Sequence, residues 1–66
     1  MPIVRVELWE GRSKDDKKKI AKGITKVLNE IVNCPPQAVE VLFTDVPKDN
    51  WAIGGELCSE TFKDVK

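Results

Sequence analysis

The stretch SKDDKKKIAKGITKVLNEIVN, residues 13–33, decides the fold because it is an amphipathic helix with clear signals at both ends. Ser13 stands where an N-cap should, and Asp16 follows three residues later as a capping-box-like partner at the positive end of the helix dipole. Apolar side chains recur with the helical period in one stripe, formed by Ile20, Ile24, Val27, Leu28 and Ile31. The pair Pro35-Pro36 ends the helix, because proline lacks the backbone donor and disfavours helical geometry in the residue before it.

Two segments that flank this helix alternate between apolar and polar residues, as strands do. The first is residues 3–9, with Val4, Val6 and Leu8 on one face. The second is residues 39–46, with Val39, Val41 and Phe43 on one face and Glu40, Leu42 and Thr44 on the other. Strand, helix and strand in this order predict an α/β fold with one β-α-β unit, whose two parallel strands are joined by a right-handed crossover. The glycines of residues 51–55 predict a short C-terminal hairpin.

The chain is expected to be a single domain over residues 1–66 that is too short to build a full core of its own. Only 41% of its 66 residues are hydrophobic, and a chain of this size buries only ~60% of its unfolded surface. One helix covers one face of the sheet, which leaves Ile3 and Leu42 on the other. We therefore expect an oligomer that pairs through the sheet, with Leu57 and Phe62 of the tail anchored onto a neighbouring subunit.

The composition excludes several classes of function. The 11 basic and 11 acidic residues cancel, which argues against a nucleic-acid partner. The absence of histidine removes the commonest general base and metal ligand, and we expect neither a metal nor a cofactor. Cys34 and Cys58 lack the paired spacing of a metal or redox site and are expected to be reduced, mostly buried thiols. No signal-peptide or membrane-spanning run occurs, so we expect a cytoplasmic protein without a membrane partner.

Pro2 carries the most distinctive chemistry in the chain. Met1 is normally removed ahead of a proline, which would leave a secondary amine at the new terminus. An ordinary α-amino group titrates at ~7.7–8.0, and desolvation or a nearby arginine lowers that pKa by disfavouring the ammonium form. A general base works best with its pKa near the operating pH, so this amine is a candidate base. On the residues alone, the competing interpretation is that Pro2 merely begins a strand behind Met1.

Several of these features resemble the 4-oxalocrotonate tautomerase family in order and spacing. They are Pro2-Ile3, Glu10-Gly11-Arg12-Ser13, the length of the helix, and Trp51-Ala52-Ile53-Gly54-Gly55-Glu56-Leu57. The similarity runs from position 2 to about position 58. It implies a β-α-β subunit, commonly assembled into a hexamer built as a trimer of dimers. It also implies a cofactor-independent isomerase, of a family linked to aromatic hydrocarbon catabolism.

The resemblance also assigns roles in a site. Pro2 would be the general acid/base that moves a proton between the hydroxyl and a carbon of an enol or dienol of a 2-keto acid. Arg12 from a neighbouring subunit would hold the carboxylate of a small substrate, which a guanidinium binds bidentately. Trp51 stands where the family usually has phenylalanine, and would be the apolar wall that keeps the pKa of the amine low.

Glu40 departs from the family pattern, because well-studied members carry a second arginine there to bind the keto-acid end of the substrate. An anion at this position would repel a dicarboxylate, so we expect 2-hydroxymuconate to be a poor substrate. Arg5, on the first strand, could supply the missing cation or could pair with Glu40 across the sheet, and we favour the ion pair.

The sequence therefore predicts a tautomerase that ketonises a small 2-hydroxydienoate or enolpyruvate-type acid. Two alternatives remain open at this point. One is a non-catalytic oligomeric binding module of the same fold. The other is a hydratase or dehalogenase of 3-substituted acrylates, in which Glu40 would activate water.

Overall fold

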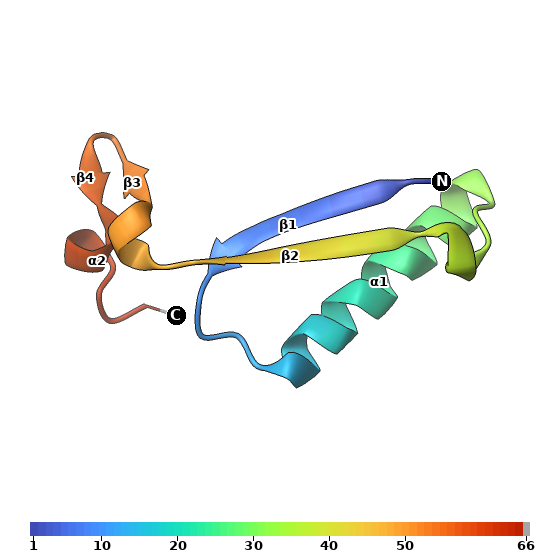
Figure 1. Ribbon diagram of the computed structural model, residues 1–66, viewed down its shortest axis with the longest axis horizontal. Coiled ribbons are helices and arrows are strands. Elements are labelled where there is room, and N and C mark those ends of the chain that lie inside the picture. Colours follow the sequence, from blue (N-terminus) through green and yellow to red (C-terminus); the bar gives the residue numbers. More distant parts are fainter. Residues whose placement is uncertain (66) are drawn as a thin grey trace.

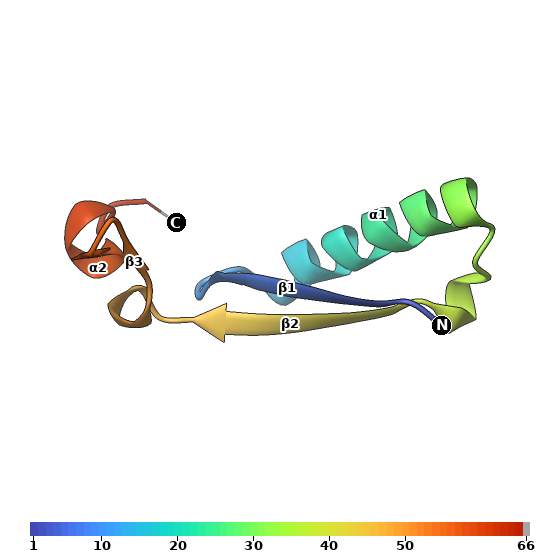
Figure 2. The same cartoon turned by 90° about the horizontal axis from the view of Figure 1, so that it is seen from above.

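Two long parallel strands with one helix across one of their faces form the body of the molecule (Figures 1 and 2). The computed structural model describes residues 1–65. The elements in chain order are β1 (Ile3–Trp9), α1 (Lys14–Val32), the 3₁₀ turn η1 (Pro36–Ala38), β2 (Glu40–Val46), the 3₁₀ turn η2 (Lys48–Asn50), β3 (Ala52–Ile53), β4 (Glu56–Leu57) and α2 (Cys58–Thr61). The predicted β-α-β unit and C-terminal hairpin are both confirmed.

The register of the parallel ladder is fixed along its whole length. β1 pairs with β2 from Ile3 opposite Glu40 to Trp9 opposite Val46. Exposed and half-buried positions alternate from Ile3 to Leu8 and from Glu40 to Thr44 as the pleat requires, with the half-buried positions facing α1. The second strand begins one residue later than the sequence pattern predicts, because Val39 closes η1 by donating its backbone N–H to the carbonyl of Pro36 at 3.3 Å.

Both ends of α1 are capped, and the N-cap is the one that the sequence predicts. The backbone N–H of Asp16 donates to the hydroxyl of Ser13 at 3.1 Å, which satisfies one donor that the helix itself cannot pair. At the other end Asn33 adopts the left-handed conformation with φ 57° and donates its N–H to the carbonyl of Asn29 at 3.1 Å. The helix is thereby set at a fixed length over the sheet.

The core of the single chain is very thin. Within residues 1–65 the only fully buried hydrophobic side chain is that of Cys58. The accessible surface is 5156 Å², against roughly 4,200 Å² for a compact monomer of this mass. The radius of gyration is 14.7 Å, against roughly 11 Å for a compact domain of this length. The expected shortage of core is confirmed.

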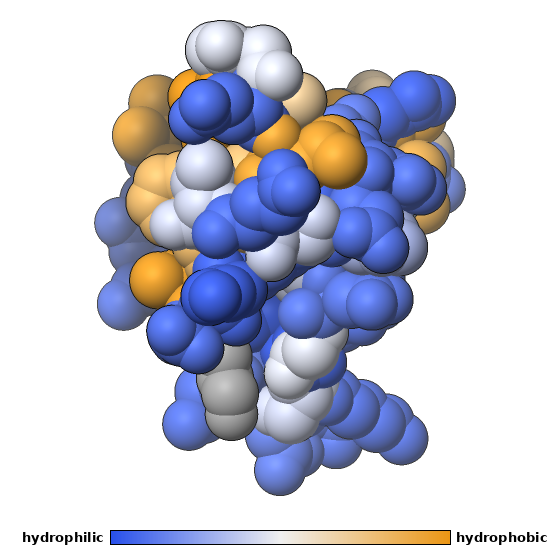
Figure 3. Space-filling view, turned by 90° about the vertical axis from the view of Figure 1, so that its left-hand side faces the viewer, coloured by the Kyte–Doolittle hydropathy of each residue, from blue (hydrophilic) through white to orange (hydrophobic). Residues whose placement is uncertain are grey.

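Apolar surface remains open on two sides. Ile3 and Leu42 are each about half exposed, at 53% and 49%, on the sheet face away from α1. A second exposed set lies along α1 and consists of Val27, Ile31 and Val32. Seen from the hairpin end, apolar surface gathers in the upper half of the molecule and hydrophilic surface in the lower half (Figure 3). No helix within the described chain has the length and apolar character needed to cross a membrane.

Candidate functional site

Pro2 lies directly before β1, and this N-terminal end of the chain is on the same side of the molecule as η1 and the C-terminal end of α1 (Figures 1 and 2). Its side chain is half-buried. Its carbonyl accepts the backbone N–H of Glu40 at 3.0 Å, which extends the parallel ladder to the start of the chain. Pro2 and Glu40 together are called the proline end below. Main-chain hydrogen bonding fixes the position of Pro2 and brings Glu40 next to it.

Arg12 and Trp51 lie at the opposite end of the ladder, which is called the tryptophan end below. Arg12 is exposed in the turn between β1 and α1, where Gly11 takes φ 113°. Because a strand rises ~3.3 Å per residue, the length of β1 separates Pro2 from this turn by roughly 25 Å. One chain therefore does not bring Pro2 together with Arg12 and Trp51.

Trp51 is half-buried and is held by two backbone hydrogen bonds and one ring contact. Its backbone N–H donates to the carbonyl of Lys48 at 3.3 Å, and its carbonyl accepts the N–H of Cys58 at 2.8 Å. The edge of its ring meets Trp9, with ring centroids 6.0 Å apart and planes at 74°. Such an edge-to-face pair is a favoured aromatic geometry. Trp51 thus presents an aromatic surface of fixed orientation at this end of the chain.

An aromatic cluster around Trp9 is the feature of this end that the sequence did not predict. The Phe62 ring lies 5.6 Å from the Trp9 ring, and the Lys48 ammonium lies 4.9 Å from the Trp9 ring centroid. The Phe62 ring thus packs on Trp9 of its own chain but is still 39% exposed, and its anchoring onto a neighbouring subunit stays a prediction. Leu57 remains 40% exposed. No local sequence signal marks this cluster, since its members lie far apart along the chain.

Glu40 and Arg5 lie on the exposed face of the sheet. Glu40 is level with Ile3, and Arg5 is level with Leu42, two positions further along. The expected ion pair between them does not form within residues 1–65, whereas Lys17 pairs with Asp45 at 2.6 Å and Lys26 with Glu30 at 3.9 Å. Two positions along a strand is roughly 6–7 Å, and an exposed pair gains too little to draw the side chains together.

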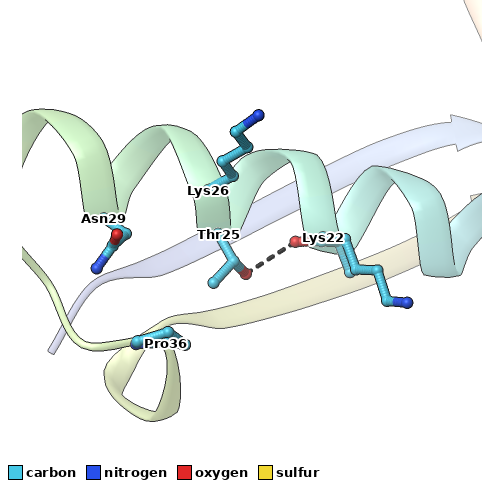
Figure 4. Close-up of a pocket in the computed structure, with 6 residues that line it drawn as sticks. Lys22, Thr25, Lys26, Asn29 and Pro36 are labelled. Atoms are coloured by element: carbon cyan, nitrogen blue, oxygen red, sulfur yellow. Dashed lines mark hydrogen bonds between the residues drawn. The ribbon is translucent and has the colours of Figure 1, made fainter.

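A groove between α1 and η1 does not contain any of these residues (Figure 4). It is lined by Ala21, Lys22, Thr25, Lys26, Asn29 and Pro36. The Thr25 hydroxyl already donates to the carbonyl of Ala21 at 2.8 Å, and the Asn29 amide donates to the carbonyl of Cys34 at 2.9 Å. Its polar groups thus serve the helix and the following loop. In the described part of the chain no group of three or more Cys, Asp or Glu side chains is placed to hold a metal ion.

Known proteins resemble the chain over most of its length. Residues 2–61 match the model of the family described as tautomerase enzyme. The 2-hydroxymuconate tautomerase of Comamonas testosteroni is 40% identical over 60 residues, which are 91% of this chain and 95% of that protein. The structure of TomN, a 4-oxalocrotonate tautomerase homologue in the tomaymycin biosynthetic pathway, matches with a TM-score of 0.89 at 31% identity, and covers 94% of this chain and 95% of its own. A heterohexameric 4-oxalocrotonate tautomerase from Chloroflexus aurantiacus matches with a TM-score of 0.85 at 27% identity, over 91% of this chain and 97% of its own.

Proposed function

We propose that this chain, which belongs to the 4-oxalocrotonate tautomerase family of isomerases, ketonises a small 2-hydroxydienoate or enolpyruvate-type acid without a cofactor. The observation that carries the proposal is the family match, which begins at Pro2 and includes Arg12 and Trp51. We also propose that residues 1–66 act as one cytoplasmic tautomerase domain. Pro2 lies at one end of the β1–β2 ladder, and Arg12 and Trp51 lie at the other. This placement supports different roles for the two ends of the ladder.

Pro2 is the proton carrier in this proposal, once Met1 has been removed. Its secondary amine takes the proton from the enol hydroxyl while the electron pair of that O–H bond forms the carbonyl. The carbon–carbon double bond opens toward the carbon that accepts the proton from the proline ammonium. One O–H bond is replaced by one C–H bond, and the amine is regenerated. The reaction needs only a base whose pKa is near neutrality, because the same group serves as base and then as acid.

Arg12 and Trp51 supply binding and exclusion of water. The Arg12 guanidinium binds the substrate carboxylate bidentately, through two parallel charge-assisted hydrogen bonds. The Trp51 ring covers the amine, and because a desolvated ammonium is disfavoured, the ring keeps the pKa of the Pro2 amine low. The fixed edge-to-face contact of Trp51 with Trp9, at 6.0 Å, suits a wall that must not move between turnovers.

The site is completed by a second copy of the chain. Because Pro2 lies roughly 25 Å from the turn that follows β1, we infer that the Arg12 and Trp51 facing a given Pro2 come from a neighbour. The exposed Ile3 and Leu42 offer one surface for such a neighbour. An apolar groove lined by Val4, Gly23, Ile24, Val27 and Leu28 offers another. We propose a homo-oligomer, and specifically a hexamer built as a trimer of dimers.

Glu40 sets the substrate class within this proposal. Its backbone is bonded to Pro2, so its carboxylate adds negative charge to the proline end. A substrate with a second carboxylate is repelled there, whereas a monocarboxylate is not. We therefore propose that enolpyruvate-type acids such as phenylenolpyruvate are better substrates than 2-hydroxymuconate, the substrate named for the relative from Comamonas testosteroni.

An intact mass of the natively expressed protein tests the proposal first. The expected mass lacks Met1, and quantitative retention of Met1 would refute the catalytic role of Pro2. Ketonisation is then followed by ultraviolet absorbance with phenylenolpyruvate and with 2-hydroxymuconate as parallel substrates. Turnover of 3-chloroacrylate with no ketonisation of either acid would point instead to the hydratase or dehalogenase alternative. No turnover of any of them would favour the non-catalytic module.

A further inference from the structure

We propose that Lys48 is a positioning residue, which clamps Trp9 to the C-terminal tail and thereby fixes the ring of Trp51. The C-terminal tail is defined here as residues 58–65. The inference rests on the proposed function, in which Trp51 is the wall beside the Pro2 of a neighbour. It concerns a lysine that touches neither the substrate nor the reacting atoms.

Lys48 ties the tail by its ammonium group. The Nζ atom donates to the backbone carbonyls of Phe62 and Val65. Phe62 is the C-cap of α2, and the last carbonyls of a helix have no partner within the helix itself. A cation at this position satisfies such carbonyls and complements the negative end of the helix. This lysine and the backbone N–H of Val65, which donates to the Phe62 carbonyl at 3.0 Å, together hold the course of the tail after α2.

The same ammonium group holds the Trp9 ring. It lies 4.9 Å from the Trp9 ring centroid, within range of a cation–π interaction. The indole Nε1 of Trp9 is buried and has no hydrogen-bond partner within residues 1–65. No hydrogen bond of the ring thus fixes its orientation, which is left to the contacts with Lys48, Phe62 and Trp51. Among these three, Lys48 is the one whose side chain both contacts the Trp9 ring and donates hydrogen bonds to the tail.

The clamp reaches Trp51 by two routes. One is through the ring, because Trp9 meets the edge of Trp51. The other is through the backbone, because the N–H of Trp51 is bonded to the carbonyl of Lys48 and its carbonyl to the N–H of Cys58, the first residue of α2. A tail released from Lys48 would move Cys58 and Phe62 together. Both contacts that orient Trp51 would then loosen at once.

The test compares Lys48→Gln with Lys48→Arg and with Lys63→Gln. Lys63 is an exposed lysine of the same tail, so its replacement is a matched control for the lost charge. The Trp9–Trp51 pair is expected to give an exciton couplet in the far-ultraviolet circular dichroism spectrum, which reports the geometry of the two rings directly. The pH profile of kcat/KM reports how well the wall protects the amine.

We expect Lys48→Gln to lose at least half of the couplet and to lower kcat/KM at neutral pH by about tenfold. The acidic limb of the pH profile should move to higher pH, because water that reaches the amine raises its pKa. Lys48→Arg should retain both signatures, since a guanidinium also stacks on indole and donates to carbonyls. Lys63→Gln should behave as the wild type.

A couplet and a pH profile unchanged in Lys48→Gln would overturn the proposal. The couplet keeps the two proposals separable, because it can be read even if the wild type has no tautomerase activity. If Lys48→Gln does not assemble, Lys48→Met decides, since it removes the ammonium group and keeps an unbranched side chain of similar length. A reduced couplet in that variant supports the clamp, and an unchanged one refutes it.

Discussion

The two ends of the β1–β2 ladder are built by different means. At the proline end, a backbone hydrogen bond of 3.0 Å fixes the position of Pro2 relative to Glu40. At the tryptophan end, backbone hydrogen bonds also hold Trp51, but its ring packs against side chains, because Trp9 contacts both Trp51 and the ammonium of Lys48. A backbone contact tolerates most substitutions, whereas a side-chain cluster changes with each one. The position of Pro2, the proposed proton carrier, should therefore change little when nearby residues are substituted. The orientation of the Trp51 ring should change with substitutions in the cluster around it.

The largest expected effect comes from breaking the proline end. Pro2→Ala should lower kcat/KM for phenylenolpyruvate by about 100-fold or more, because a positioned general acid/base contributes ~10²–10⁴-fold. Alanine also permits removal of Met1, so the variant differs only in replacing a rigid secondary amine by a flexible primary one. Steady-state assays with unchanged circular dichroism as the folding control measure this. A rate equal to that of the wild type would rule out the proposed mechanism.

Breaking the tryptophan end should cost binding instead. Arg12→Ala is expected to raise KM by about 10- to 100-fold, because it removes a charge-assisted bidentate contact. Since the two ends of one site come from different chains in this proposal, mixing unfolded Pro2→Ala and Arg12→Ala chains before refolding should restore activity. Random assembly would give about a quarter of the sites both intact groups. A mixture no more active than its components would mean that a site is not shared in this way.

Glu40→Arg tests the difference between the two ends, because it reverses the side-chain charge at the proline end and keeps the backbone hydrogen bonds of the β1–β2 ladder. We expect kcat/KM for 2-hydroxymuconate to rise roughly tenfold, because a repelling anion becomes a cation near the second carboxylate. The value for phenylenolpyruvate should change little. Glu7→Arg, on the same exposed face of β1 but away from Pro2, is the matched control. An equal change with both substrates, or in both variants, would argue against a local effect of Glu40.

The smallest expected effect falls on the scaffold between the two ends. Ser13→Ala removes the hydroxyl that accepts from the N–H of Asp16, and loss of such a cap costs ~1 kcal/mol. Denaturant unfolding at a fixed chain concentration should show a lower midpoint, with kcat/KM unchanged. Ser13→Thr keeps an acceptor and should show a smaller loss. A fall in activity as large as that of Arg12→Ala would show that the turn is part of the site.

The sequence predicted what depends on neighbouring residues. The Ser13 cap, the alternation of β1 and the glycine hairpin are each set within a few residues, and the structure has all three. The contact of Trp9 with Phe62 joins residues far apart in the chain, and neither spacing nor composition could reveal it. The prediction of an Arg5–Glu40 ion pair was wrong for a related reason. Strand alternation shows which face of the sheet a residue lies on, but it does not show which residues of the two strands lie opposite each other.

The sheet of β1 and β2 has only two strands, so each of them is an edge strand. An open edge is a template for any other extended chain, whether a sister copy or an aggregating one. A newly synthesised chain must therefore associate with other copies of itself before its open strand edges pair with an unrelated chain. Its stability cannot be separated from how many sister chains surround it. Dilution should then lower the stability of the folded chain, and the level of expression becomes part of what makes it fold.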